Sequence, residues 1–314
     1  VNTAVEPHDF GPPTGPGLRC TRDVRAGEVF LEVPLASVIT SKFARSQVIA
    51  DLGLTSADAE KQALPGVTPQ DILCLWLLLE RRKGDASEFA TFQVTLPKVV
   101  EEMSAAFWPE DVLAELQGCE ALVRLADNKE RVESMFRRVE EAVKASGPHI
   151  EAKFAGCLSL DSYVWARCVL NSRQFQGSWY PDDEETGILV PLVDMLNHDC
   201  GLPHGQCVRR GAGGDTLEIV ALRDFACGEE AMITYGQEGS SRLLERGFAV
   251  DGNPDECVEL IMGVRCSEIR LPDLLAAQTQ GSVDLDEDFE WLKAPEPDCS
   301  EAEVRIVLRR RRPL

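Results

Sequence analysis

The densest group of polar residues in an apolar setting lies in the segment PLVDMLNHDC, residues 191–200. Asp194, Asn197 and His198 follow a short apolar run there, and buried strands do not usually end in three such residues. Carboxylate, amide and imidazole groups can bind a ligand or orient a reacting nitrogen. The same residue types also favour turns, so a strand end closed by turn-forming polar groups is an equal alternative.

A metal centre is the next possibility, because cysteines and histidines continue the same segment. His198, Cys200, His204 and Cys207 have the spacing H-x-C-x3-H-x2-C, which offers four candidate zinc ligands. This spacing matches none of the regular pairs of structural zinc sites, and all four side chains would have to surround one ion within ten residues. We therefore expect no metal.

Two other short segments carry groups that could react or bind. Tyr235, one of three tyrosines, ends an apolar run directly before Gly236. A role in the core, with the hydroxyl at the rim, is the common alternative to catalysis for such a tyrosine. Arg173 lies in the segment SRQF at the end of an expected helix, where it could cap helix carbonyls or bind an anionic ligand.

Short strands on both sides of a helical block would have to position these residues. Apolar runs bounded by Gly, Asp or Pro predict strands at residues 18–22, 28–33, 188–192, 206–209, 216–221, 230–235 and 257–262. Apolar residues at three- and four-residue steps predict helices over 68–83, 109–146 and 160–171, with candidate breaks at Gly118 and at Asp127-Asn128. We expect the first ten residues to be a loose lead-in and residues 284–314 to be a solvated, charged tail. Strands followed by helices and then strands again favour an α+β fold over a parallel α/β sheet.

One seven-residue segment occurs twice. Residues 22–28 read RDVRAGE and residues 223–229 read RDFACGE, each between two strand-like segments. The period between them does not fit a solenoid repeat. We interpret them as two similar turns and not as a duplicated domain.

Composition excludes several classes of function. The 314 residues carry 32 Lys and Arg against 53 Asp and Glu, a formal charge of −21, which disfavours nucleic-acid binding and favours basic protein segments. No apolar run is long enough to cross a membrane. The eleven cysteines are odd in number and scattered, and no secretory leader is visible, so we expect reduced thiols in an intracellular protein.

Taken in order, these segments resemble SET-domain methyltransferases, in particular the group similar to the Rubisco large-subunit lysine methyltransferase. The resemblance covers residues 15–248, about three quarters of the chain, and each segment alone is weak. Its segments are GPGL (15–18), the two RD…GE turns, YVWA (163–166) with SRQF (172–175), DMLNH (194–198), ITYG (233–236) and GF (247–248).

The resemblance implies a β-rich SET core with a large helical insert and a threaded C-terminal segment. The expected division is residues 1–70 and 171–252 for the two parts of the SET domain, with the helical insert at 71–170. Residues 253–314 would then hold only the start of the family's substrate-binding region, followed by the charged tail.

The resemblance also implies S-adenosylmethionine as cofactor and a protein side chain, lysine first, as methyl acceptor. A histidine acceptor, or a SET-like binding module without activity, stays open. We expect a monomer that contacts neither nucleic acid nor membrane. The residues implied for the cofactor are Gly15, Pro16, Gly17, Arg173, Asn197 and His198; Tyr235 would be catalytic, and Asp194, Arg173, Arg246 and Phe248 would face the substrate.

Two departures from the family pattern concern the acceptor and the metal. Arg246 precedes Gly247-Phe248 where the family often has a second tyrosine, which puts the number of methyl groups and the choice of substrate in doubt. The Cys-x-Cys-x4-Cys zinc motif of many histone-modifying members is absent, because Cys257, Cys266 and Cys299 are too far apart in the chain.

Overall fold

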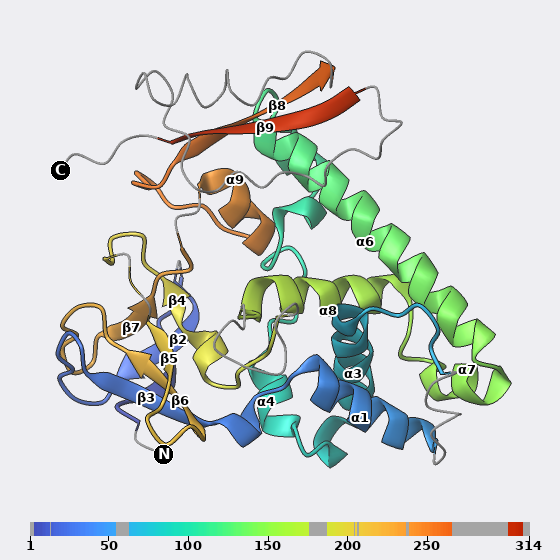
Figure 1. Ribbon diagram of the computed structural model, residues 1–314. Coiled ribbons are helices and arrows are strands. Elements are labelled where there is room, and N and C mark those ends of the chain that lie inside the picture. Colours follow the sequence, from blue (N-terminus) through green and yellow to red (C-terminus); the bar gives the residue numbers. More distant parts are fainter. Residues whose placement is uncertain are drawn as a thin grey trace.

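A computed structural model describes residues 3–12, 14–54, 63–175, 187–203, 205, 207–236, 239–265 and 301–309. Short strands occupy one side of the molecule and helices the other, as Figure 1 shows. The strands come from both ends of the sequence, while the helices come mostly from the middle. This mixture of separate strands and helices is the α+β architecture that the sequence predicts.

The strands form two small sheets and a separate hairpin. The first sheet has the order β1-β2-β7-β4 and the second the order β3-β6-β5. Their strands are β1 (Val5–Asp9), β2 (Pro16–Cys20), β3 (Val29–Pro34), β4 (Asn197–His198), β5 (Val208–Arg210), β6 (Thr216–Val220) and β7 (Glu230–Ile233). The hairpin pairs β8 (Cys257–Arg265) with β9 (Glu301–Arg309) in antiparallel register.

One strand pair brings the candidate site together. β4 runs parallel to β7, with Asn197 opposite Met232 and His198 opposite Ile233. β2 pairs with the other edge of β7, in antiparallel register. The segments that contain Gly17, Asn197 and Tyr235 therefore meet at a single strand.

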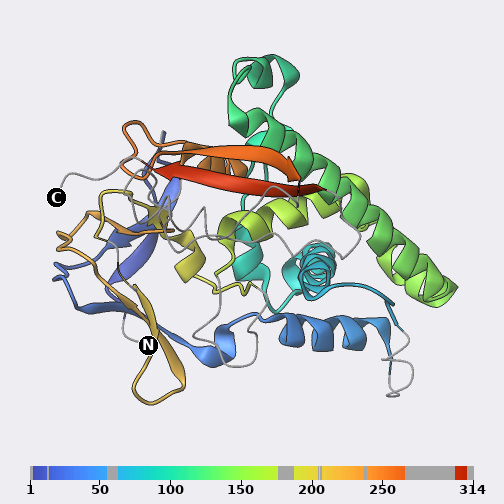
Figure 2. The same cartoon turned by 45° about the horizontal axis from the view of Figure 1, so that its top comes forward.

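Helices from Ser41 to Arg173 form the second part of the molecule, and α3 lies at its centre. In Figure 2, α3 is seen nearly end-on between α1 and α8, and both pack against it. The described helices of this part are α1 (Ser41–Leu52), α3 (Pro69–Lys83), α4 (Ala90–Thr95), α5 (Glu110–Ala114), α6 (Glu120–Ala145), α7 (Pro148–Phe154) and α8 (Leu160–Arg173). The division between residues 1–70 and the insert at 71–170 stays a prediction.

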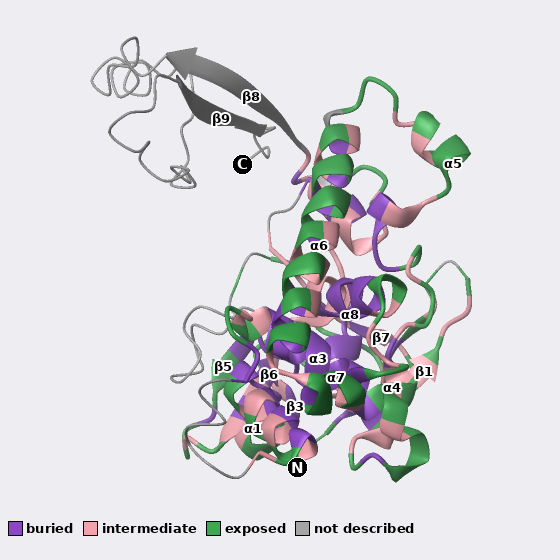
Figure 3. Cartoon of the chain, turned by 90° about the vertical axis from the view of Figure 1, so that its right-hand side faces the viewer, coloured by how far each residue is buried: buried purple, intermediate pink, exposed green. Residues whose placement is uncertain are grey.

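Local sequence explains where the two central helices begin. The Thr68 hydroxyl oxygen accepts a hydrogen bond from the Asp71 amide, and the Asp71 carboxylate accepts one from the Thr68 amide, which is a capping box. Ser159 and Ser162 make the same arrangement at the start of α8. Figure 3 shows both helices almost entirely buried, whereas the outer face of α6 is exposed. Apolar burial therefore holds α8 rigidly beneath the site.

The two RD…GE turns bind each other reciprocally. Asp23 Oδ1 accepts a hydrogen bond from the Cys227 amide at 2.9 Å, and Asp224 Oδ1 accepts one from the Ala26 amide at 2.8 Å. Val24 and Phe225 exchange two backbone hydrogen bonds between these contacts. The repeated segment thus forms a pair of related turns, and this contact fastens the N-terminal strands to the later ones.

The structure corrects several predicted elements. Residues 5–9 are strand β1, bonded along β2, and not a loose lead-in. Residues 301–309 are strand β9, so this part of the expected tail is paired. Residues 188–192 make only isolated bridges, at Ile188 and Leu189, because the chain turns at Leu192, which has a φ of 75°. The break at Gly118 is present, with a φ of 83° between α5 and α6, but the candidate break at Asp127-Asn128 is wrong, because α6 continues through both residues. Helix α1 was not predicted.

Candidate functional site

Tyr235 lies just beyond the end of β7, and two hydrogen bonds fix its position. Its hydroxyl donates to the Leu196 carbonyl at 2.8 Å, and its backbone N–H donates to His198 Nδ1 at 3.0 Å. Gly236 follows with a φ of 110°, a conformation that side chains rarely adopt, so the chain can turn there. Tyr235 is therefore held against the segment that carries Asn197 and His198.

Asn197 joins the glycine segment to the site. Its Nδ2 donates to the Pro16 carbonyl at 3.1 Å and to Glu230 Oε1 at 2.7 Å. A Cβ atom on Gly17 would lie 2.5 Å from Glu230 Oε1 and 3.1 Å from Asn197 Nδ2. A side chain at position 17 would therefore push the Glu230 carboxylate away from Asn197, while a Cβ on Gly15 would meet nothing within 4 Å.

A buried ion pair between Arg173 and Asp194 is the next part of the site. Arg173, at the C-terminal end of α8, donates through Nη1 to Asp194 Oδ2 and to the Asp194 carbonyl, both at 3.1 Å. The Asp194 side chain is fully buried and that of Arg173 is 12% exposed. Burial raises the pKa of Asp194, and the charge of Arg173 opposes this shift.

Arg246 and Phe248 close the site from the C-terminal side. The Arg246 guanidinium carbon lies 5.5 Å from the centre of the Tyr235 ring, and the Phe248 ring is edge-on to Tyr235 at 6.4 Å. Gly247 between them has a φ of 88°, and a Cβ there would lie 2.3 Å from the Glu102 carbonyl oxygen. This close packing of Gly247 on the Glu102 backbone therefore fixes the positions of Arg246 and Phe248 beside Tyr235.

The charges of these groups all act on the Tyr235 hydroxyl. Burial raises the pKa of Tyr235 to about 12, the cations Arg173 and Arg246 oppose the shift, and the carboxylates Asp194 and Glu230 add to it. The hydroxyl consequently keeps its proton at neutral pH. It can donate or accept a hydrogen bond beside a ligand, but it is no base.

The structure brings together most of the residues singled out in the sequence. Pro16, Gly17, Asn197, His198, Arg173, Asp194, Tyr235, Arg246 and Phe248 line one region. Gly15 lies at its edge, in the turn before β2, where its φ is 72°. The roles expected for these residues stay predictions.

Two contributors escaped the sequence analysis. Glu230 accepts the Asn197 hydrogen bond, and burial raises its pKa. An acidic residue within an apolar strand was the available signal. The Leu196 carbonyl, which holds Tyr235, carries no signal in a sequence.

Two absences concern the described residues alone. Within those ranges, no group of three or more His, Cys, Asp or Glu side chains could hold a metal ion. His204, one of the four candidate zinc ligands, lies outside them. Nor does any described helix have the length and apolar character that a membrane span needs.

Comparison with protein families decides the assignment. The model of the SET domain matches residues 15–236, more than half of the chain. This protein belongs to the SET domain family. The match contains both RD…GE turns, the whole helical part and Tyr235, and the predicted family and fold class are thereby confirmed.

Curated relatives and solved structures extend this result. The chain is 30% identical over 258 residues to the actin-histidine N-methyltransferase of Canis lupus familiaris and 28% identical over 257 residues to that of Homo sapiens. Each match covers 81% of this SET-domain chain and 41% of the relative. The chain thus spans about two fifths of the length of these relatives.

The solved structures are similar in fold. The SET domain of LSMT bound to methyllysine and AdoHcy matches with a TM-score of 0.72 and 21% identity, covering 99% of this chain and 64% of that one. The same domain bound to lysine and AdoHcy matches with a TM-score of 0.70 and 22% identity. At this identity the similarity establishes the fold.

Proposed function

We propose that this SET domain is an S-adenosylmethionine-dependent protein N-methyltransferase. The observation that carries the proposal is the convergence of Gly17, Asn197, Arg173 and Tyr235 in one region of a SET fold. The relatives and solved structures support the proposal: the relatives are named protein methyltransferases, and the solved structures are complexes with AdoMet or AdoHcy.

The residues present fit this cofactor. Gly17 has no side chain in the narrow space beside Glu230 and Asn197, so a ligand bound at Asn197 could approach the β2 backbone closely. Arg173 supplies a cation for a carboxylate, and Asn197 with His198 supplies amide and imidazole groups for the polar remainder. When bound, the cofactor supplies an electrophilic methyl group on a sulfonium sulfur.

The chain itself provides position and charge. The protonated Tyr235 hydroxyl faces the acceptor nitrogen and holds it in line for displacement, while the Leu196 carbonyl fixes that hydroxyl. The rings of His198 and Phe248, with centres 6.3 Å apart, both pack on Tyr235 and exclude water from that part of its surface. Desolvation of the site favours the neutral form of an entering amine or imidazole.

Histidine is the acceptor that we propose first. The relatives at 28–30% identity are named for histidine. The chemistry agrees, because an imidazole has a pKa of about 6.5 and enters neutral at physiological pH. A lysine ammonium must lose its proton at a cost of about 4 kcal/mol, and it would approach the Arg246 cation. Lysine is the second candidate, named in the solved complexes.

Tritiated S-adenosylmethionine tests the proposal. The protein is incubated with purified actin and, separately, with cell extract, with the Tyr235→Phe variant as control. Labelled protein is hydrolysed, and the methylated amino acid is identified by mass spectrometry. We expect methylhistidine. Methyllysine would replace the first acceptor by the second, and no label in any preparation would favour the non-catalytic module.

A further inference from the structure

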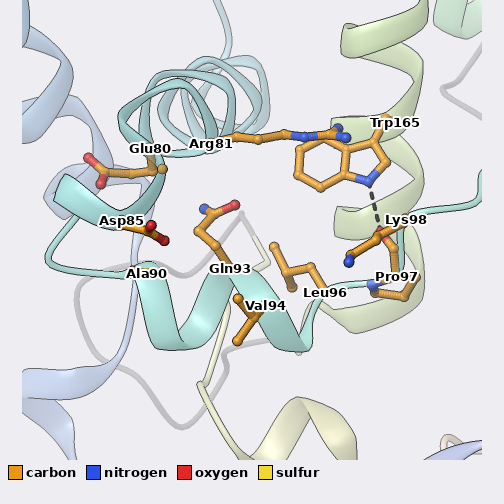
Figure 4. Close-up of a pocket in the computed structure, with 11 residues that line it drawn as sticks. Glu80, Arg81, Asp85, Ala90, Gln93, Val94, Leu96, Pro97, Lys98 and Trp165 are labelled. Carbon is orange, nitrogen blue, oxygen red and sulfur yellow. Dashed lines mark hydrogen bonds between the residues drawn. The ribbon is translucent and has the colours of Figure 1, made fainter.

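A second pocket lies in the helical part, away from Tyr235. It is formed where the end of α3, helix α4 and the segment after α4 meet Trp165 of α8 (Figure 4). Its volume is about 170 Å³. Sites for cofactor-sized ligands are larger, about 300–1,000 Å³, whereas a cavity of about 150 Å³ holds benzene. The pocket therefore suits one side chain and not a cofactor.

An unused hydrogen-bond donor lines this pocket. Gln93 Nε2 is buried, and no described residue accepts a hydrogen bond from it. A buried donor without an acceptor costs about 1–3 kcal/mol. A ligand that carries a carbonyl or carboxylate oxygen would remove that cost.

The pocket has a basic end and an acidic end. The Arg81 guanidinium carbon lies 4.1 Å from the centre of the Trp165 ring, and Lys98 is at the same end, as Figure 4 shows. Glu80 and Asp85 are at the other end, with Gln93 between. Glu80 is bound by Lys83 and Ser87, so its charge is already compensated. The chain as a whole carries a charge of −21, but Arg81 and Lys98 make the end at Trp165 locally basic, so this end is the place for an anionic group.

Apolar surface surrounds the opening. Val94, which lines the pocket, is 73% exposed, and Val99, just beyond Lys98, is 45% exposed. These two side chains can supply apolar contact to a group that enters the pocket. Apolar contact together with an anionic group describes a peptide with an apolar residue next to an acidic one.

The pocket is linked to the methylation site through α8. Trp165 and Arg173 lie on this helix eight residues apart, which corresponds to about 12 Å along its axis. An extended chain advances about 3.3 Å per residue. The separation of Trp165 and Arg173 along α8 therefore equals the length of about four residues of extended chain.

We propose that this pocket, formed by Arg81, Gln93, Val94, Lys98 and Trp165, docks an acidic–apolar segment of the protein substrate. The apolar side chain packs on Val94 and Trp165, and the carboxylate binds at Arg81 and Lys98. Gln93 donates to an oxygen of the docked segment. The identification of the partner as a methylation substrate rests on the proposed function. The binding of an acidic–apolar peptide to the pocket does not depend on it.

Direct binding tests the pocket without any methyl transfer. The acetylated and amidated tetrapeptide Gly-Leu-Glu-Gly is titrated into the full 15N-labelled chain and compared with Gly-Leu-Lys-Gly. The readout is the indole N–H signal of Trp165, assigned with Trp165→Phe. We expect the acidic peptide to shift this signal. Lys98→Glu and Gln93→Leu should weaken binding about fivefold or more, the effect of losing one such contact. Lys129→Glu, an exposed charge reversal on α6, should leave it unchanged.

Equal shifts by both peptides, no shift at tens of millimolar, or equal weakening by Lys129→Glu would overturn the proposal. A kinetic test then concerns the substrate. In the tritium assay Lys98→Glu should raise KM for the protein substrate and leave kcat and S-adenosylmethionine affinity unchanged. An unchanged KM would mean that the substrate does not use the pocket. Absence of methyl transfer by the unmodified chain would count against the proposed function alone, since the binding test stands without it.

Discussion

The Tyr235→Phe substitution separates a catalytic tyrosine from a structural one. It removes one hydrogen bond, from the hydroxyl to the Leu196 carbonyl at 2.8 Å, and leaves that carbonyl in a residue that is 1% exposed. The expected loss of stability is about 1–3 kcal/mol, because a buried acceptor loses its donor. The phenyl ring keeps the contacts with His198 and Phe248, so the fold should survive.

The catalytic loss should be larger than the structural one. Under the proposed function the hydroxyl orients the acceptor mainly during methyl transfer, so kcat should fall by about one to three orders of magnitude, at about 1.4 kcal/mol per tenfold. Cofactor affinity, measured by calorimetry, should stay nearly constant. The number of methyl groups transferred could also change, because the missing hydroxyl leaves room for water or a second methyl group.

Chemical denaturation, calorimetry and single-turnover methylation on the same preparation check these expectations. A variant with a normal rate and a normal product, but lower stability, would show that Tyr235 only supports the core. A variant that loses cofactor binding together with its rate would place the hydroxyl in the cofactor pocket.

Four further predictions concern the same region. Arg173→Ala leaves Asp194 buried without its cation, so stability should fall by about 3–5 kcal/mol and calorimetry should find S-adenosylmethionine binding sharply weakened; unchanged affinity would remove Arg173 from the site. Gly17→Ala places a Cβ 2.5 Å from Glu230 Oε1 and should weaken cofactor binding, measured by calorimetry; unchanged affinity would refute this reasoning. The pKa of Tyr235 is raised from 10 to about 12, so its contribution to the free energy of unfolding is complete below pH 10 and is lost as the pH rises towards 12. In a plot of unfolding free energy against pH, Tyr235→Phe should reduce the slope between pH 10 and 12. Elemental analysis should find no zinc, and one zinc per chain that is lost in Cys200→Ser would contradict the expectation.

Much of the fold could be predicted where the signal is local. The capping residues Thr68 and Asp71 mark the start of α3, and the glycine at position 118 separates two helices. Strands β6 and β7 begin at the expected residues, because apolar runs bounded by Gly or Asp have few alternatives. These features depend on neighbours within a few residues.

The remaining elements depend on partners far along the chain. Strand β1 reads Val-Glu-Pro-His-Asp, a poor strand by composition, and it forms because β2 pairs along its whole length. The ion pair of Arg173 with Asp194 joins a helix end to a 3-10 turn, and no local pattern encodes that distance. The family resemblance singled out the candidate residues, and their contacts with one another required the three-dimensional structure; their roles stay predictions.

The reciprocal contact between the two RD…GE turns has a consequence for the order of folding. Its hydrogen bonds join residues 198 and 204 positions apart, so the closure entropy of a very long loop opposes them. Their one direct ion pair, Arg25 with Asp224, is highly exposed and contributes little. During synthesis, β2 and β3 can pair with β7 and β6 only after about 200 further residues have left the ribosome. The helices between them, built from local contacts, should form first and shorten the loop. The candidate site around Tyr235 would therefore be among the last regions to assemble.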